Sequence, residues 1–251
     1  MADALACRSS IHSTDRYLAT LVVCRSVEAH PLDASDEGRH TPGDDRWWTE
    51  SWTFDFWTDG GSLGGYASIT LVPNLRKAWY WAALVGEGRP LVTVVDLDVL
   101  APRARLEIRS DALWADHVCE TPFDHWTVGN EAVAVALDDP SEALGLARGT
   151  QSPLGFDLEW EATAAPVSDG RPCFYRQDAV VHGEVLVGPE RLEIDAIGAR
   201  THRWDGARWW ETATGTERAG LRAPFVIESP GGRFVIERVL DAGGWHDWVR
   251  P

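Results

Sequence analysis

Hydrophobic and polar residues alternate along most of the chain after residue 45, with the period of two that is typical of half-buried β-strands. The clearest example is residues 47–57, WWTESWTFDFW. One face of this segment carries Trp48, Glu50, Trp52, Phe54 and Phe56. A Gly-rich stretch that favours a tight turn follows, and residues 65–72 then form the predicted return strand.

Further segments show the same alternation or a short apolar run. In chain order they are residues 78–85, 91–97, 106–109, 113–119, 125–137, 154–163, 178–187, 191–200, 222–228, 233–239 and 245–249. Short helices are expected only at 15–23 and 141–147. Many short strands without strand–helix–strand alternation predict an all-β protein, built as an antiparallel barrel or sandwich.

The most linker-like stretch of the predicted fold is residues 164–172, AAPVSDGRP, which predicts a boundary between two halves. Residues 1–44 are polar and show no sustained period, so we expect a weakly ordered N-terminal arm there. The expected organisation is an arm at 1–44, a first domain at 45–165 and a second, shorter domain at 166–251.

Composition excludes several classes of partner. The chain has 23 Lys and Arg against 39 Asp and Glu, a net charge of −16, which disfavours nucleic acid and anionic membranes. A short apolar run at 17–23 is too brief for a signal peptide or a transmembrane helix, so we expect a cytoplasmic protein without stable membrane insertion. The oligomeric state is left open.

Motifs for cofactor chemistry are missing from the sequence. Its four cysteines have neither metal-site nor disulfide-framework spacing, and they are interpreted as free thiols in a reducing compartment: Cys7, Cys24, Cys119 and Cys173. There is no phosphate loop, no GxSxG motif and no zinc-hydrolase spacing. We therefore expect no cofactor and no metal.

Tryptophan is unusually abundant, with 14 Trp against 7 Phe and one Met. An indole ring combines a large apolar face with one N–H donor, so these residues suit either a pocket wall or a core. Alternation places Trp79 and Trp81 on one face of their strand and Tyr80 on the other. We predict that the two tryptophans face inward, as part of a pocket or of the core.

Ionisable residues are concentrated in residues 113–137, LWADHVCETPFDHWTVGNEAVAVAL. Alternation separates Asp116 from His117, and His125 and Glu131 from Trp126. If the two strands pair around Thr121-Pro122, their histidines and carboxylates become neighbours. A buried carboxylic acid with a raised pKa, oriented by an imidazole, suits protonation of an unsaturated hydrocarbon, and indole faces stabilise the resulting cation.

The alternative is that Asp116, Glu120 and Glu131 face solvent and that the histidines are structural. The same two interpretations apply to a second cluster, His202-Arg203-Trp204-Asp205, which either lines a site or packs at a strand corner.

Several segments resemble the lipocalin-like superfamily that includes carotenoid hydratases. They are residues 47–51, 54–56, 64–66, 73–75, 78–81, 113–120, 125–127, 131, 137–140 and 182–191. The resemblance implies two consecutive lipocalin-like antiparallel β-barrel or sandwich domains that share an interface, with a pocket for a hydrophobic small molecule. Relatives carry an acidic residue before the histidine that corresponds to His202. Here that residue is Thr201, so the acid is lost or replaced by Asp205 or Asp116.

The predicted function is that of a cofactor-independent enzyme that hydrates or cyclises a terpenoid or polyene by acid catalysis. The candidate catalytic residues are Asp116, His117, His125, His202 and Asp205. The candidate ligand-binding residues are Trp52, Trp79, Trp81, Trp126, Glu131 and Trp204. The alternatives are a shape-driven, Diels–Alderase-like pericyclase, a non-catalytic carrier of a hydrophobic metabolite, and a structural protein whose tryptophans are core.

Overall fold

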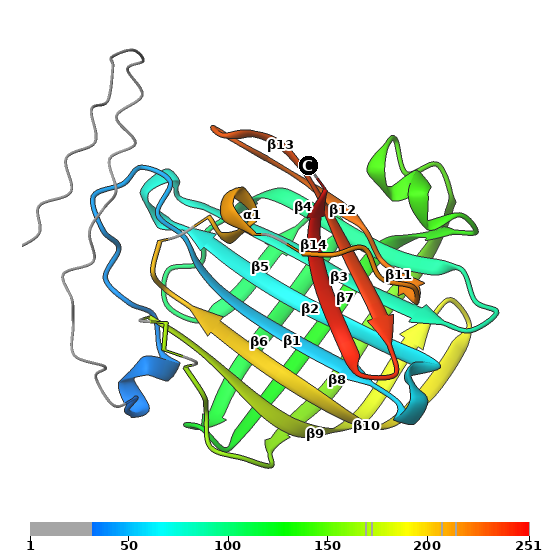
Figure 1. Ribbon diagram of the computed structural model, residues 1–251, viewed down its shortest axis with the longest axis horizontal. Coiled ribbons are helices and arrows are strands. Elements are labelled where there is room, and N and C mark those ends of the chain that lie inside the picture. Colours follow the sequence, from blue (N-terminus) through cyan, green and yellow to red (C-terminus); the bar gives the residue numbers. More distant parts are fainter. Residues whose placement is uncertain (1–31, 169, 172, 207, 214, 251) are drawn as a thin grey trace, which may run out of the picture. The chain divides into compact units, whose positions relative to one another are not determined.

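The computed structural model describes residues 32–168, 170–171, 173–206, 208–213 and 215–250, and Figure 1 shows the strands that dominate it. The helix expected at residues 15–23 lies outside this range, as do Cys7 and Cys24. Neither Cys119 nor Cys173 forms a disulfide bond with another described residue. The described residues include no helix with the length and apolar character needed to cross a membrane. The predicted all-β fold class is confirmed.

Ten strands form one antiparallel sheet in the order β4-β3-β2-β1-β10-β9-β8-β7-β6-β5. They are β1 (Glu50–Trp57), β2 (Leu63–Val72), β3 (Lys77–Gly86), β4 (Leu91–Leu100), β5 (Leu106–Ser110), β6 (Leu113–Thr121), β7 (His125–Leu137), β8 (Thr150–Ala162), β9 (Phe174–Val187) and β10 (Glu190–Arg203). Because β4 also pairs with β7, the sheet closes into a barrel, and the β5-β6 hairpin continues beyond β7.

The second sheet is small and covers part of the outer face of the barrel, in front of β2 and β3 in Figure 1. It contains β11 (Leu221–Arg222), β12 (Phe225–Ser229), β13 (Gly232–Asp241) and β14 (Gly244–Arg250). β13 pairs with each of the other three strands.

The described helical segments are short. They are η1 (Ala34–Glu37), η2 (Asp59–Gly61), η3 (Pro73–Leu75), η4 (Pro140–Leu144) and α1 (Trp209–Thr212). The helix expected at residues 141–147 is the 3-10 turn η4. The sequence did not indicate α1, because four residues are too few to establish a helical period.

The large sheet crosses the domain boundary expected at residues 165 and 166. β9 and β10 follow that boundary in the chain, yet they lie between β8 and β1 in the sheet. The linker-like stretch before β9 therefore connects two neighbouring strands, and the change of sheet falls later, between β10 and β11.

The aromatic face predicted for residues 47–57 points into the barrel. Trp52, Phe54 and Phe56 are each no more than 1% exposed and belong to the barrel core. Gly65 pairs with Phe56, and a Cβ atom at Gly65 would lie 2.6 Å from the Phe56 ring. A glycine is needed there because the ring occupies that space.

The outer face of β3 forms a second core, beneath the small sheet. Trp81 stacks on Phe225 with the ring centroids 5.1 Å apart, and Trp79 lies 5.4 Å from Trp210. Both tryptophans are therefore buried in a core, as predicted, but that core lies beneath the small sheet, whereas Tyr80 points into the barrel. The same alternation governs both arrangements, but the sequence did not reveal that a second sheet covers the outer face.

A buried ion pair lies at one end of the barrel. Glu37 of η1 and Arg200 of β10 are each 4% exposed, and Nη1 of Arg200 donates to Oε2 of Glu37 at 2.8 Å. Nη2 of Arg200 donates to the other carboxylate oxygen at 2.5 Å, and the indole N–H of Trp126 also donates to Glu37. Residues 34–37, predicted to belong to a weakly ordered arm, instead supply a buried charge to the barrel.

His117 is an ionisable group buried in the barrel interior. Its side chain is buried, with its ring 5.2 Å from that of Phe54 and 6.1 Å from that of Tyr80. Neither ring nitrogen has a hydrogen-bond partner among the described residues. Burial lowers the pKa of His117 to about 3, so the imidazole is neutral in the folded protein.

We expect Glu37→Gln to destabilise the fold by roughly 3 kcal/mol, because it leaves the guanidinium of Arg200 buried without a counter-charge. Urea unfolding measures this change in the free energy of unfolding. Glu190→Gln is the matched control, since Glu190 and Arg89 form an exposed ion pair, and its cost is expected to stay below about 1 kcal/mol. Equal small losses in the two variants would contradict the importance of the buried pair.

The lowered pKa of His117 predicts a loss of stability in acid. Between the unfolded pKa of 6.5 and the folded pKa of about 3, the unfolded chain binds the extra proton, so stability falls as the pH is lowered through this range. At pH 5 the loss amounts to about 2 kcal/mol. When the pH is lowered from 7.5 to 5, we expect the free energy of unfolding of His117→Leu to fall by about 2 kcal/mol less than that of the wild type. Urea unfolding at the two pH values measures this difference.

The control for this comparison is His182→Leu, which changes a histidine whose side chain is 45% exposed. Its pH dependence should match that of the wild type. If His117→Leu and the wild type lost the same free energy of unfolding between pH 7.5 and pH 5, His117 would not remain neutral in the folded protein.

Candidate functional site

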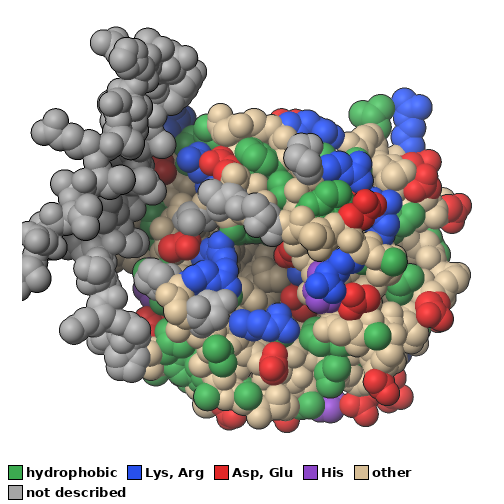
Figure 2. All heavy atoms as spheres, viewed as in Figure 1, with side chains coloured by type: hydrophobic (Ala, Val, Ile, Leu, Met, Phe, Trp, Pro, Cys, Tyr) green, Lys and Arg blue, Asp and Glu red, His purple; other side chains and the backbone are tan. Residues whose placement is uncertain are grey.

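A cavity of about 610 Å³ lies between the outer face of the barrel and the small sheet, and we call it the intersheet cavity. One wall comes from paired residues of β1 and β10, in which Ser51 lies opposite Arg203 and Thr53 lies opposite Thr201. Because side chains alternate along a strand, these polar residues point away from the barrel core that Trp52 and Phe54 occupy. Figure 2 shows a hollow in this face of the molecule, with charged side chains at its border.

The other walls are strongly aromatic. The rings that line the intersheet cavity belong to Trp81, Phe174, Trp209, Phe225 and Trp245. They come from β3, β9, α1, β12 and β14, so both sheets contribute. Apolar walls with a few convergent polar groups are the usual environment for a small organic molecule.

Arg238 of β13 is the central polar residue of the cavity. It is 4% exposed, donates to Oδ1 of Asp55 at 2.9 Å and to Oδ1 of Asp247 at 2.6 Å, and lies 4.1 Å from the centre of the Tyr66 ring. Nη1 of Arg238 has no hydrogen-bond partner among the described residues. Nη1 is itself fully buried, so an acceptor oxygen in the cavity can bond to it only after the Arg238 side chain shifts.

Asp55 is the buried carboxyl group of this cluster. Burial raises its pKa above the ordinary value, the hydrogen-bonded guanidinium of Arg238 opposes this rise, and the negative charge of Asp247 adds to it. Asp55 is therefore easier to protonate than an exposed aspartate.

Basic residues outnumber acidic ones in the lining of the cavity, although the whole chain is acidic. Four arginines line it together with three aspartates, within a protein of net charge −16: Arg171, Arg176, Arg203, Arg238, Asp55, Asp205 and Asp247. A ligand with acceptor oxygens and an apolar body matches this combination of guanidinium groups and aromatic rings.

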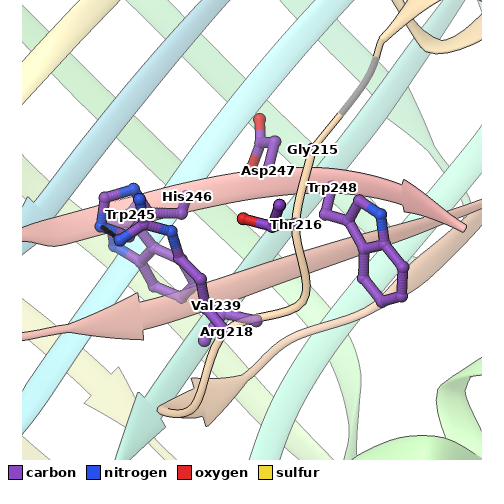
Figure 3. A pocket seen from close by; sticks show the side chains of 8 residues that line it. All are labelled: Gly215, Thr216, Arg218, Val239, Trp245, His246, Asp247 and Trp248. Carbon is purple, nitrogen blue, oxygen red and sulfur yellow. Dashed lines mark hydrogen bonds between the residues drawn. The ribbon is translucent and has the colours of Figure 1, made fainter.

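A smaller cavity of about 310 Å³ lies along β14. Figure 3 shows the segment that carries Gly215, Thr216 and Arg218 crossing over β13 and β14. Nε2 of His246 lies 3.0 Å from Oδ1 of Asp241 and 3.5 Å from Nη1 of Arg218. These groups already bond to one another, and few apolar rings surround them, so this cavity is a weaker candidate for an apolar ligand.

Three residues at the end of the barrel form a compact set of possible metal ligands, which we call the His–Glu cluster. Nδ1 of His40 lies 2.7 Å from Oε1 of Glu50, and Nε2 of His202 lies 3.1 Å from the same oxygen. One ligand atom from each residue falls within 4.8 Å of the others. The His40 side chain is 22% exposed, whereas those of Glu50 and His202 are only 1% exposed.

The structure brings some of the predicted site residues together. Asp205 and Trp81 both line the intersheet cavity. His202, Trp52 and Trp204 meet at the His–Glu cluster, where the His202 ring stacks on that of Trp52 at 4.3 Å and lies 4.7 Å from that of Trp204.

The remaining candidates lie apart. Asp116 is half-buried on the outside of β6, where burial raises its pKa, while His117 points into the barrel. His125 lies 3.7 Å from Glu159 on the outside, and Glu131 is exposed. Trp126 bonds to Glu37, and Trp79 packs beneath the small sheet.

The segment 113–137 therefore does not form a single acid and imidazole site. β6 and β7 do pair as predicted, but Asp116 lies opposite Gly129 and His117 lies opposite Val128. Alternation puts the carboxylate and the imidazole on different faces of the sheet, so proximity along the chain did not become proximity in space.

Sequence reasoning missed Arg238, Asp55 and Asp247 in the intersheet cavity, and His40 and Glu50 in the His–Glu cluster. Asp55 and Arg238 are 183 positions apart, so no local spacing links them. The sequence feature that could have indicated these residues is a charged residue within an otherwise apolar strand, as in residues 234–240, FVIERVL. Such a charge requires a buried partner.

Comparison with known proteins gives a limited result. No curated protein matches the chain. A solved structure of CghA with Sch210972 matches 82% of this chain and 64% of that chain, with 12% sequence identity and a TM-score of 0.35. The chain thus spans less than two thirds of that protein's length, and nothing about activity follows from so distant a match.

A family model covers most of the chain. Residues 33–218 match a domain of unknown function, DUF7064. The matched range begins just before η1 and includes the whole large sheet, α1 and the first part of the segment that leads to β11. The resemblance to carotenoid hydratases is not confirmed by this match and stays a prediction. The chain belongs to the DUF7064 family.

Proposed function

We propose that the protein binds a polyene or terpenoid that carries a carbonyl or carboxylate oxygen in the intersheet cavity, and that it promotes cyclisation of this ligand. The observation that carries the proposal is the guanidinium of Arg238, which lines a cavity with aromatic walls. The aromatic rings fit an apolar chain, and a guanidinium group fits one oxygen of that chain.

Charge favours cyclisation over hydration. Hydration of an alkene by acid passes through a carbocation, and four guanidinium groups against three carboxylates make the cavity unfavourable for an additional positive charge. A cyclisation in which Arg238 donates a hydrogen bond to a conjugated carbonyl needs no cation. The aromatic walls then contribute by holding the chain in a folded, reactive conformation.

Asp55 and Asp205 are the carboxyl groups of the cavity that fit the acid-catalysed alternative. Asp55 has the raised pKa, and Asp205 belongs to the pair of aspartates that the sequence suggested as a substitute acid. A non-catalytic carrier uses the same cavity and the same donor. Binding and turnover therefore need separate experiments.

The first experiment measures binding with probes that share one polyene skeleton. Retinal, retinoic acid and retinol differ in the terminal oxygen group, and their affinities are obtained from quenching of tryptophan fluorescence. We expect Arg238→Lys to lower the affinity for retinal and for retinoic acid by roughly 10-fold or more, because one charge-assisted hydrogen bond contributes about 1.5–3 kcal/mol. Retinol should be affected less.

A second variant tests the cavity without altering a buried charged side chain. Thr201→Trp places a large ring in the intersheet cavity, and we expect it to lower the affinity for all three probes at least ~10-fold. Thr150→Trp adds the same ring at an exposed position of β8 and should bind the three probes with the affinity of the wild type. Equal affinities in Thr201→Trp and Thr150→Trp would place the binding site elsewhere.

Turnover separates the enzyme from the carrier. The wild type is incubated with a linear polyene that bears an α,β-unsaturated carbonyl group, and loss of its conjugated absorbance is followed. The proposed cyclisation should survive Asp55→Asn and Asp205→Asn and should be lost in Thr201→Trp. Loss of activity in either aspartate variant, with binding retained, would favour acid catalysis, and binding without turnover would leave a carrier.

A further inference from the structure

We infer that His40, Glu50 and His202 bind a divalent transition-metal ion at the end of the barrel. The inference is independent of the proposed function, because it concerns the opposite face of the same two strands. Glu50 and His202 point to the barrel interior, whereas Ser51 and Arg203 point to the intersheet cavity.

The donor atoms have the spacing of a small metal site. The contacts of Oε1 of Glu50 with His40 and His202, at 2.7 and 3.1 Å, are close to the separations between neighbouring ligands around one ion. Small movements of the partly exposed His40 would place all three atoms around a common centre. Two imidazoles and one carboxylate leave further coordination positions for water or substrate.

The hydrogen bonds behind the two histidines support this assignment. Nδ1 of His202 lies 2.8 Å from the backbone oxygen of Asp36, and Nε2 of His40 lies 3.4 Å from Oδ1 of the same residue. Each ring therefore directs one nitrogen at Glu50 and the other at an acceptor that fixes its orientation. Metal-binding histidines are held in this way, by a carbonyl or a carboxylate behind the ring.

The ligand set selects the class of metal. Imidazole nitrogens favour zinc, iron, cobalt and their neighbours over calcium and magnesium, which prefer oxygen ligands. Trp204 stacks on His40 at 4.3 Å with the ring planes nearly parallel, so an aromatic surface borders the cluster on the side of its most exposed member.

The experiment uses the full chain without an affinity tag, stripped of metal by a chelator and titrated with Co²⁺ and then Zn²⁺. We expect one equivalent of Co²⁺ to give a visible absorption spectrum, Zn²⁺ to displace it, and Zn²⁺ to raise the melting temperature. His40→Ala and Glu50→Gln should each weaken Zn²⁺ binding at least ~100-fold, and Asp36→Asn should weaken it by roughly 10-fold.

The matched control is His182→Ala, which removes a partly exposed histidine 3.5 Å from Asp195 and should bind Zn²⁺ as the wild type does. The chain also contains Cys7, His12, Cys24 and His30 outside the described residues, and these could bind metal as well. The quantity compared is therefore the number of metal equivalents bound by the wild type and by each variant. Glu50→Gln preserves the side-chain shape, and circular dichroism checks its fold. Unchanged stoichiometry and spectrum in folded His40→Ala and Glu50→Gln, or no Co²⁺ spectrum in the wild type, would overturn the inference.

Discussion

The pairing of β1 with β10 is the constraint on which the rest of the structure depends. These strands close the gap between the first and last parts of the large sheet, and their register fixes the face to which each side chain points. One set of alternate residues builds the barrel interior and the His–Glu cluster. The other set builds a wall of the intersheet cavity, so a shift of register by one residue would exchange the two sites.

Each face of this strand pair is also associated with a buried guanidinium. Arg200 lies on the inner side with Glu37, and Arg238 reaches the outer side from the small sheet to meet Asp55. Buried ion pairs add little net stability, because desolvation offsets most of their attraction, but they penalise any arrangement that separates the partners. The two pairs thus attach η1 and the small sheet to the barrel in defined positions.

The sequence predicted the strands well and their three-dimensional grouping poorly. Alternation in residues 47–57 correctly gave both the strand and its buried aromatic face, because that signal is local. It did not show that Trp79 and Trp81 lie under a second sheet, or that Glu37 reaches Arg200 across 163 positions. For the same reason, the candidate residues within 113–137 do not form one site in the structure. Asp205 and Trp81, which are far apart in the sequence, line the same cavity.

The contrast between an acidic protein and an arginine-lined cavity has a consequence for ligand selection. A charge of −16 repels an approaching anion over distances of about 8 Å at physiological salt, whereas the guanidinium groups attract it only inside the cavity. An anionic ligand would enter slowly and bind well, and its rate of entry would rise with salt. A neutral carbonyl compound meets no such barrier, so the surface of the molecule would favour neutral ligands kinetically even where the cavity itself accepts both.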